Sequence, residues 1–213
     1  MESKENVFAK LLLNWHKSNR REFPWRKTDD PYLIFISEFF LQRTPANRVA
    51  VIIPLFIKEF PTANELANAN VKRIQQRYAS LGLTKRLYWL TESMKIIVQK
   101  YNGRIPKEYS DLMSLPGVGN YTASAILTFA YKQRIPIIDT NVVRVLSRVF
   151  GFYILTEKVH VTANNTAINV LPKNNPTEYN MAILDFGALI CKKRPLCLQC
   201  PLNEICDYFK NNR

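Results

Sequence analysis

Apolar residues recur at helical spacing in six segments of this chain, and this periodicity limits its possible folds more than any other feature. Proline and glycine separate the segments, and no alternating run leads into a two-residue hairpin turn. The pattern predicts an all-α protein without internal repeats. The predicted helices are 7–17, 49–60, 86–101, 121–132, 141–150 and 179–190.

The charge of the chain indicates a polyanionic partner. The 213 residues carry a net charge of +13, and the basic residues are spread along the chain rather than gathered in a tail. Dispersed charge can serve solubility alone, but a folded basic face gains affinity for nucleic acid by releasing counterions. The N-terminus lacks an apolar signal segment, and Glu38 interrupts the best apolar run, 32–41. We therefore expect no membrane association and a cytoplasmic protein, associated with the nucleoid.

All four cysteines lie near the C-terminus, at Cys191, Cys197, Cys200 and Cys206. Two disulfides are disfavoured in an intracellular chain, whereas zinc or an iron–sulfur cluster held by four thiolates are both reasonable. Spacing barely separates the last two. Either metal group would organise a segment that is too short for a core of its own. The loop between Cys191 and Cys197 contains three basic residues, Lys192, Lys193 and Arg194. These residues form either a solvated charged loop only, or a loop that the metal group holds rigid so that it contacts phosphate.

The run LPGVGNYTA (115–123) predicts a hairpin between two helices. Pro116 ends the first helix, while Gly117 and Gly119 permit a tight turn and Asn120 can begin the next helix. Such a turn at a helix N-terminus presents backbone N–H groups that bind phosphate without reading sequence. A Gly-x-Gly alone is often just a turn, but the whole motif before an apolar helix is more specific.

Two carboxyl groups lie in contrasting sequence contexts. Asp139 directly precedes a predicted helix, where capping is the commoner role and the helix dipole favours an ionised carboxylate. Glu38 has apolar neighbours, so desolvation favours its protonated form. One ionised and one protonated carboxyl form the pair that cleavage of a glycosidic bond requires.

These motifs together resemble the helix-hairpin-helix DNA glycosylases of the endonuclease III and MutY group, and FPWR (23–26) and CPL (200–202) fit as well. The resemblance implies a six-helix barrel with the hairpin at 22–134. It implies a second helical lobe at 1–21 and 135–213, in which the four cysteines bind a [4Fe-4S] cluster. The first cysteine gap is one residue shorter than is usual in the family. DNA would lie in a cleft between the lobes, with one nucleotide flipped out.

The residue two positions after the second hairpin glycine separates the subfamilies. Bifunctional relatives carry a catalytic lysine there, whereas this chain has Tyr121, which implies a monofunctional enzyme that leaves an abasic site. The chain ends soon after Cys206, so we expect no 8-oxoguanine-sensing domain of the MutY type. Both features resemble the MIG-type glycosylases, which remove thymine or uracil opposite guanine. The alternatives are adenine excision and a DNA-binding protein without catalysis.

The resemblance also implies roles for individual residues. Asp139 would stabilise the sugar cation and orient water, and Glu38 would hydrogen-bond or protonate the base. Asn141 would position one of these groups, and Tyr121 would face the flipped base or merely pack on the hairpin. Leu83 would be a wedge between bases or a core leucine. The expected partners are mismatched double-stranded DNA and a downstream AP endonuclease, with the protein acting as a monomer. The expected DNA contacts are Gly117, Val118, Gly119, Gln42, Arg43, Leu83, Lys192, Lys193 and Arg194.

Overall fold

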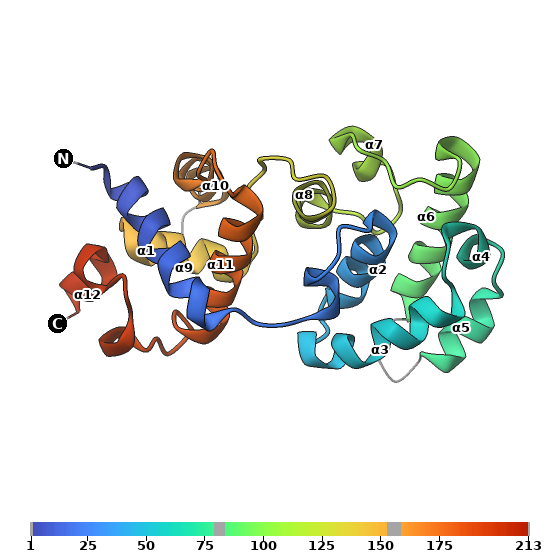
Figure 1. Cartoon of the computed structure of the whole chain (residues 1–213), viewed down its shortest axis with the longest axis horizontal. Helices are drawn as coiled ribbons and strands as arrows, with labels where there is room; N and C mark the ends of the chain where they lie inside the picture. The colour runs from blue at the N-terminus through green and yellow to red at the C-terminus, as the bar shows by residue number, and fades with distance from the viewer. Residues whose placement is uncertain (1, 79–83, 153–158, 213) are drawn as a thin grey trace. The chain divides into compact units, whose positions relative to one another are not determined.

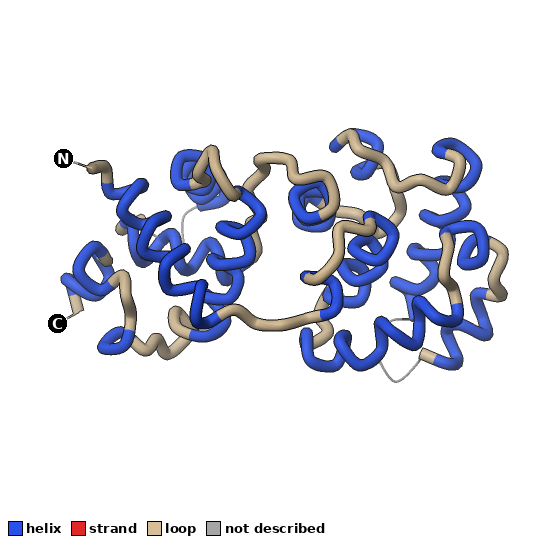
Figure 2. The backbone as a smooth tube through the Cα atoms, in the orientation of Figure 1, coloured by secondary structure: helices blue, strands red, loops and turns tan. Residues whose placement is uncertain are grey.

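The computed structural model describes residues 2–78, 84–152 and 159–212, and all of the regular structure in these ranges is helical (Figure 2). The predicted all-α class is confirmed. In these ranges no helix combines the length and the apolar character that crossing a membrane requires.

The chain divides into two compact units. The first unit comprises residues 1–21 and 132–213, and the second comprises residues 22–131. In Figure 1 the first unit therefore combines the blue N-terminal helix with the yellow-to-red C-terminal helices. Residues 132–134 belong to the first unit, so the boundary lies three residues before the one that the family resemblance implies.

The first unit is built on the packing of its N-terminal helix against helices from the end of the chain. Helix α1 contacts α10 and α11, and α9 contacts α10, α11 and α12. The elements are α1 (Lys4–Asn19), α9 (Thr140–Phe150), α10 (Val159–Val170), α11 (Pro176–Leu189), η3 (Cys197–Gln199), η4 (Asn203–Ile205) and α12 (Asp207–Asn211).

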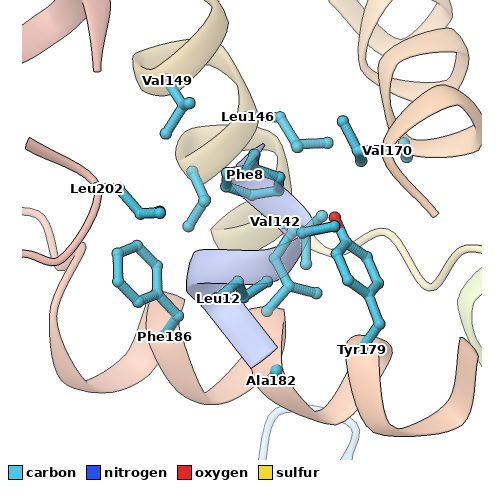
Figure 3. Close-up of a cluster of buried hydrophobic side chains, with 14 of the residues drawn as sticks. Phe8, Leu12, Val142, Leu146, Val149, Val170, Tyr179, Ala182, Phe186 and Leu202 are labelled. Carbon is cyan, nitrogen blue, oxygen red and sulfur yellow. The ribbon is translucent and has the colours of Figure 1, made fainter. Parts of the chain in front are cut away.

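The core of this unit collects apolar side chains from α1, α9 and α11 (Figure 3). Phe8 and Leu12 of α1 are fully buried in this cluster. Leu202, from the segment between the cysteines, is buried in the same cluster. The cysteine segment therefore packs onto the core of the first unit instead of forming one of its own.

The second unit is organised around α2, which contacts η1, α3, α6 and α8. Most of α2 is buried, including both flanks of Glu38. Pro31 occupies the first helical position, and the Asp30 side chain caps the helix by accepting a hydrogen bond from the Tyr32 N–H at 2.9 Å. The elements are η1 (Pro24–Arg26), α2 (Pro31–Leu41), α3 (Ala46–Glu59), α4 (Ala63–Ala67), α5 (Val71–Arg77), α6 (Thr84–Tyr101), α7 (Tyr109–Met113) and α8 (Asn120–Phe129).

The six predicted helices are present as α1, α3, α6, α8, α9 and α11, with ends shifted by a few residues. Helix α8 stops at Phe129, before Lys132 adopts a left-handed backbone with φ 57°. Helix α7 ends at Met113, so Pro116 does not end it as expected and lies in the hairpin turn.

Candidate active site

Asp139 caps the N-terminus of α9. Its Oδ1 accepts a hydrogen bond from the Val142 N–H at 2.7 Å, and its Oδ2 accepts one from Asn141 Nδ2 at 2.7 Å. The side chain is half-buried, so part of it remains accessible. Because a carboxylate offers about four lone-pair positions, the cap leaves acceptor capacity for a water or a substrate group. The capping role and a chemical role are therefore compatible.

A chain of hydrogen bonds runs from Asp139 to the cysteine segment. Asn141 Oδ1 accepts from Arg144 Nη2 at 2.8 Å, and the guanidinium also donates to the carbonyls of Gly187 at 3.0 Å and Cys191 at 2.9 Å. A Cβ on Gly187 would lie 3.1 Å from the Asn141 Cβ, so glycine there allows α11 to approach α9 closely. The orientation of Asn141, and through it that of Asp139, is thus tied to α11 and Cys191.

Glu38 lies in the interior of the second unit, on α2, with 2% of its surface exposed. Its Oε2 has no hydrogen-bond partner among the described residues. Burial raises the pKa of Glu38 to about 8, although the positive charge of Arg26 lowers it in part. The desolvation expected from its apolar neighbours is present, and the carboxyl is largely protonated at neutral pH.

The hairpin between α7 and α8 contains two glycines that differ in backbone conformation and in surroundings. Gly117 has φ +78°, and a Cβ there would lie 2.9 Å from Cε1 of Phe39. Gly119 has an ordinary φ of −112°, and apart from its own residue and its two chain neighbours no atom of the described chain lies within 4 Å of a Cβ built there. Only Gly117 is required by the fold itself. The bare surface at Gly119 suits the close approach of another molecule.

Side chains from α2 and α6 hold the hairpin in place. Gln42, just after α2, donates from Nε2 to the Gly117 carbonyl at 3.1 Å, and Ser93 Oγ donates to the Pro116 carbonyl at 2.8 Å. Val118 is buried, and its N–H is bonded to the Leu115 carbonyl at 3.2 Å. Gln42 and Val118, both expected to contact DNA, thus also stabilise the turn.

The four cysteines are free thiols that line one pocket beside Arg148 and Phe186. Burial, together with the smaller effect of the three other cysteines, raises the pKa of the Cys200 thiol to about 11, while the Leu202 N–H lowers it in part. A cation between the thiols would reverse this effect, because it favours thiolates. Leu202 N–H and Arg148 Nη1 point at the sulfurs of Cys200 and Cys191, at 3.4 and 3.5 Å, as donors to thiolates would. The chemistry of the four donors therefore fits a thiolate-ligated metal group, although among the described residues no three or more Cys, His, Asp or Glu side chains are already arranged around a metal position.

Comparison with known proteins identifies the family. Residues 36–166 match the HhH-GPD superfamily of base excision DNA repair proteins. The chain belongs to this superfamily. The predicted membership of the helix-hairpin-helix DNA glycosylases is thereby confirmed.

Three relatives of this HhH-GPD protein are informative. The thymine/uracil-DNA glycosylase of Methanothermobacter thermautotrophicus is 32% identical over 210 residues, which cover 97% of this chain and 95% of the relative. The adenine DNA glycosylase of Buchnera aphidicola is 35% identical over 209 residues, and the match covers 97% of this chain but 60% of that enzyme. A solved structure of a thermostable thymine-DNA glycosylase superposes with a TM-score of 0.92 at 32% identity, covering 98% of this chain and 97% of that one.

The remaining predicted site residues of this HhH-GPD protein lie on both units. Tyr121 is half-buried in the first turn of α8, and Arg43 is exposed just after α2 with a left-handed φ of 59°. Leu83 lies outside the described residues. The basic loop is exposed, while Arg148 donates to its carbonyls at Lys192 and Lys193, at 2.6 and 3.1 Å. The backbone of the loop is therefore held while its cationic side chains face outward.

Arg86 is a candidate residue that the sequence analysis did not single out. It lies in the first turn of α6, and its Nη1 is buried without a hydrogen-bond partner among the described residues. Burial lowers its pKa, and the nearby charge of Arg43 lowers it further. Two neighbouring guanidinium groups suit an anion such as phosphate. The sequence signal for this residue is the basic run TKRLYW (84–89), which opens α6.

Proposed function

We propose that this HhH-GPD protein is a DNA glycosylase that excises thymine or uracil paired with guanine. The observation that carries the proposal is the pair of carboxyl groups in opposite surroundings, Asp139 hydrogen-bonded at both oxygens and Glu38 buried and largely protonated. The choice of base is supported by similarity to thymine and thymine/uracil glycosylases over nearly their full lengths.

The two carboxyl groups suit the two halves of the reaction. Cleavage moves the electrons of the glycosidic bond onto the base and leaves positive charge on the sugar. The carboxylate of Asp139 would counter that charge and take a proton from the water that adds to C1′. Glu38 would donate a hydrogen bond or its proton to the departing base. Asn141 would keep Asp139 oriented during both steps. The products are a free base and an abasic site, which a downstream AP endonuclease would process.

We also propose that the enzyme is monofunctional. Strand cleavage by a glycosylase needs an amine that forms a Schiff base with the sugar, and the position after the hairpin holds the phenol of Tyr121. Borohydride should therefore trap no covalent complex with DNA. The variant Tyr121→Lys, which supplies an amine, is the positive control. Trapping of the wild type would contradict the assignment.

DNA contacts are proposed on both units. On the second unit, the open surface at Gly119 lies at the N-terminus of α8, where N–H groups favour a phosphate. Arg43 and Arg86 would bind a further phosphate of the backbone. On the first unit, the exposed basic loop between Cys191 and Cys197 would make the same kind of contact.

The four thiols are proposed to hold a [4Fe-4S] cluster. They line one pocket, and the resemblance of the chain to the endonuclease III and MutY group favours the cluster over zinc. When bound, it would supply charge and a rigid tether for the basic loop. Iron and inorganic sulfide in equal amounts in the purified protein would support this, whereas stoichiometric zinc without iron would contradict it.

Adenine excision is the second candidate, favoured by 35% identity over 97% of this chain to an adenine glycosylase. Duplexes containing T·G, U·G, A·G and A·8-oxoguanine distinguish the two under single-turnover conditions. We expect release of thymine and uracil. Release of adenine without thymine would replace the proposed substrate, and no base release from any duplex would favour a DNA-binding protein without catalysis.

A further inference from the structure

Asn180 is a buried polar residue that neither the family comparison nor the proposed chemistry assigns. It lies on α11, and 1% of its surface is exposed. Its Oδ1 accepts a hydrogen bond from the Ile137 N–H at 2.8 Å, and its Nδ2 donates to the carbonyls of Ile135 at 3.0 Å and Pro176 at 2.9 Å. Because the oxygen only accepts and the NH2 group only donates, these partners fix one orientation of the amide.

The segment that Asn180 binds leads into Asp139. Residues 132–139 carry no helix or strand, so their backbone groups need partners outside regular structure. Asn180 supplies one acceptor and one donor to this segment, as a neighbouring strand would. The Ile137 side chain is buried, and without Asn180 its N–H would lose its hydrogen bond.

Asp139 is thereby held from two directions. On its C-terminal side, its carboxylate is bonded to the Val142 N–H in the first turn of α9. On its N-terminal side, the backbone two residues earlier is bonded to α11 through Asn180. Arg144 joins α9 to α11 as well, through the Gly187 carbonyl. The position of the carboxylate therefore depends on α11 at both ends of the 135–142 segment.

We propose that Asn180 is a positioning residue for Asp139, setting where the carboxylate stands without touching the DNA. This inference rests on the proposed role of Asp139 in base excision. Displacement of a reacting group by about 1 Å can cost ~100-fold in rate. Loss of the Asn180 amide removes the hydrogen bonds at Ile135 and Ile137. Arg134 still donates to the Leu171 and Pro172 carbonyls, and Asp139 keeps its own hydrogen bonds.

The kinetic test compares Asn180→Ala with Leu12→Ala, which opens a cavity in the same core, at a temperature where both are fully folded. We expect Asn180→Ala to lower the single-turnover rate on T·G duplex by about 10- to 100-fold, with an unchanged Kd for DNA. Leu12→Ala should leave the rate within about threefold of wild type, since it removes none of the hydrogen bonds made by Asn180 or Asp139. Equal losses in both variants, or no loss in Asn180→Ala, would overturn the proposal.

A double mutant shows whether the effect passes through Asp139. In the Asp139→Asn background, Asn180→Ala should not reduce the residual rate further, because there is no carboxylate left to position. Additive losses would mean that Asn180 acts elsewhere and would refute the inference.

Amide hydrogen exchange tests the same inference without any activity. Asn180→Ala should speed exchange at Ile137 and also at Val142, whose N–H binds Asp139, while Leu12→Ala should not change the ratio between these two sites. Faster exchange at Ile137 with unchanged exchange at Val142 would mean that Asn180 holds the 132–139 segment but does not position Asp139, which would refute the proposal. If the wild type releases no base, the proposed function fails, yet this result still decides the structural claim.

Discussion

The start of α9 and the middle of α2 give two carboxyl groups opposite surroundings. Asp139 stands at an open helix N-terminus, where two N–H donors satisfy its oxygens. Glu38 stands inside a helix that is buried around it, and its Oε2 has no partner in the described chain. Burial inside α2 therefore raises the pKa of Glu38, whereas Asp139 has hydrogen-bond donors and partial access to solvent, before any substrate is present.

The largest effect should come from Asp139, and a second capping aspartate separates its chemical role from its capping role. Asp139→Asn should lower base release by about 10²- to 10⁴-fold, the usual contribution of a positioned acid or base. DNA binding and stability should persist, because asparagine caps a helix as well as aspartate does.

Asp30→Asn is the matched control for this change. Asp30 caps α2 through the Tyr32 N–H in the same way, so the control should keep full activity. Single-turnover rates and gel-shift affinities measure both effects. If Asp139→Asn and Asp30→Asn excise equally well, the open carboxylate is only a cap.

Glu38→Gln tests the buried side of the comparison, and we expect it to lower excision by about 100-fold. In the wild type the excision rate should also fall as pH rises through about 8, where Glu38 loses its proton. A rate that stays level through pH 9, or an undiminished rate in the variant, would remove Glu38 from the chemistry.

The same variant has a pH-dependent effect on stability. Folding raises the pKa of Glu38, so its favourable contribution is full below about pH 4.3 and is lost as pH rises to about 8. Glu38→Gln does not titrate and should gain about 3 kcal/mol relative to wild type between pH 5 and pH 7. Urea unfolding at both pH values measures the difference, and a pH-independent difference would show that Glu38 is ionised in the folded protein.

The two hairpin glycines offer a second comparison, between a position packed against a side chain and a position with open space around it. In Gly117→Ala the new Cβ would clash with the Phe39 side chain of α2, and alanine would be strained at a positive φ. The variant should therefore be destabilised by about 1–3 kcal/mol. In Gly119→Ala the new methyl group would contact no side chain of the described protein, so the melting temperature should not change. The methyl group would stand on the surface proposed to approach DNA, so binding should weaken. Thermal melts and binding isotherms separate the two. A stable Gly117→Ala variant, or unaltered binding by Gly119→Ala, would contradict the assignment.

The smallest expected effect concerns Arg86. Arg86→Ala should weaken binding to matched and mismatched duplexes alike and reduce the slope of log K against log salt by about 1, the loss of one phosphate contact. The change should not alter which base is released. A loss confined to mismatched duplex would indicate that Arg86 reads a base instead.

Local patterns predicted much of this protein. The periodic helices, the hairpin glycines, the capping Asp139 and the cysteine group all depend on near neighbours in sequence, and each is where the pattern placed it. Helix α10 was not predicted because its asparagines and β-branched residues are weak helix formers, and it packs against α1 and α9. Helix α2 shows little periodicity because it is apolar on nearly every side.

Long-range contacts could not be predicted in this way. The bonds from Asn180 to Ile137 and from Arg144 to Cys191 join residues more than 40 positions apart. A helical pattern indicates that a residue faces the core, but not which backbone group it meets there. The nearness of Arg86 to Arg43 likewise depends on how α2 and α6 pack.

The central claim is that Glu38 keeps its proton at neutral pH while the chain also presents an accessible carboxylate at Asp139. A ¹³C NMR titration of the carboxyl carbons, with Glu38→Gln to assign the resonance, measures this directly. We predict a midpoint near 8 for Glu38. A midpoint near the ordinary value of about 4.3 would show that Glu38 is ionised and would contradict the account.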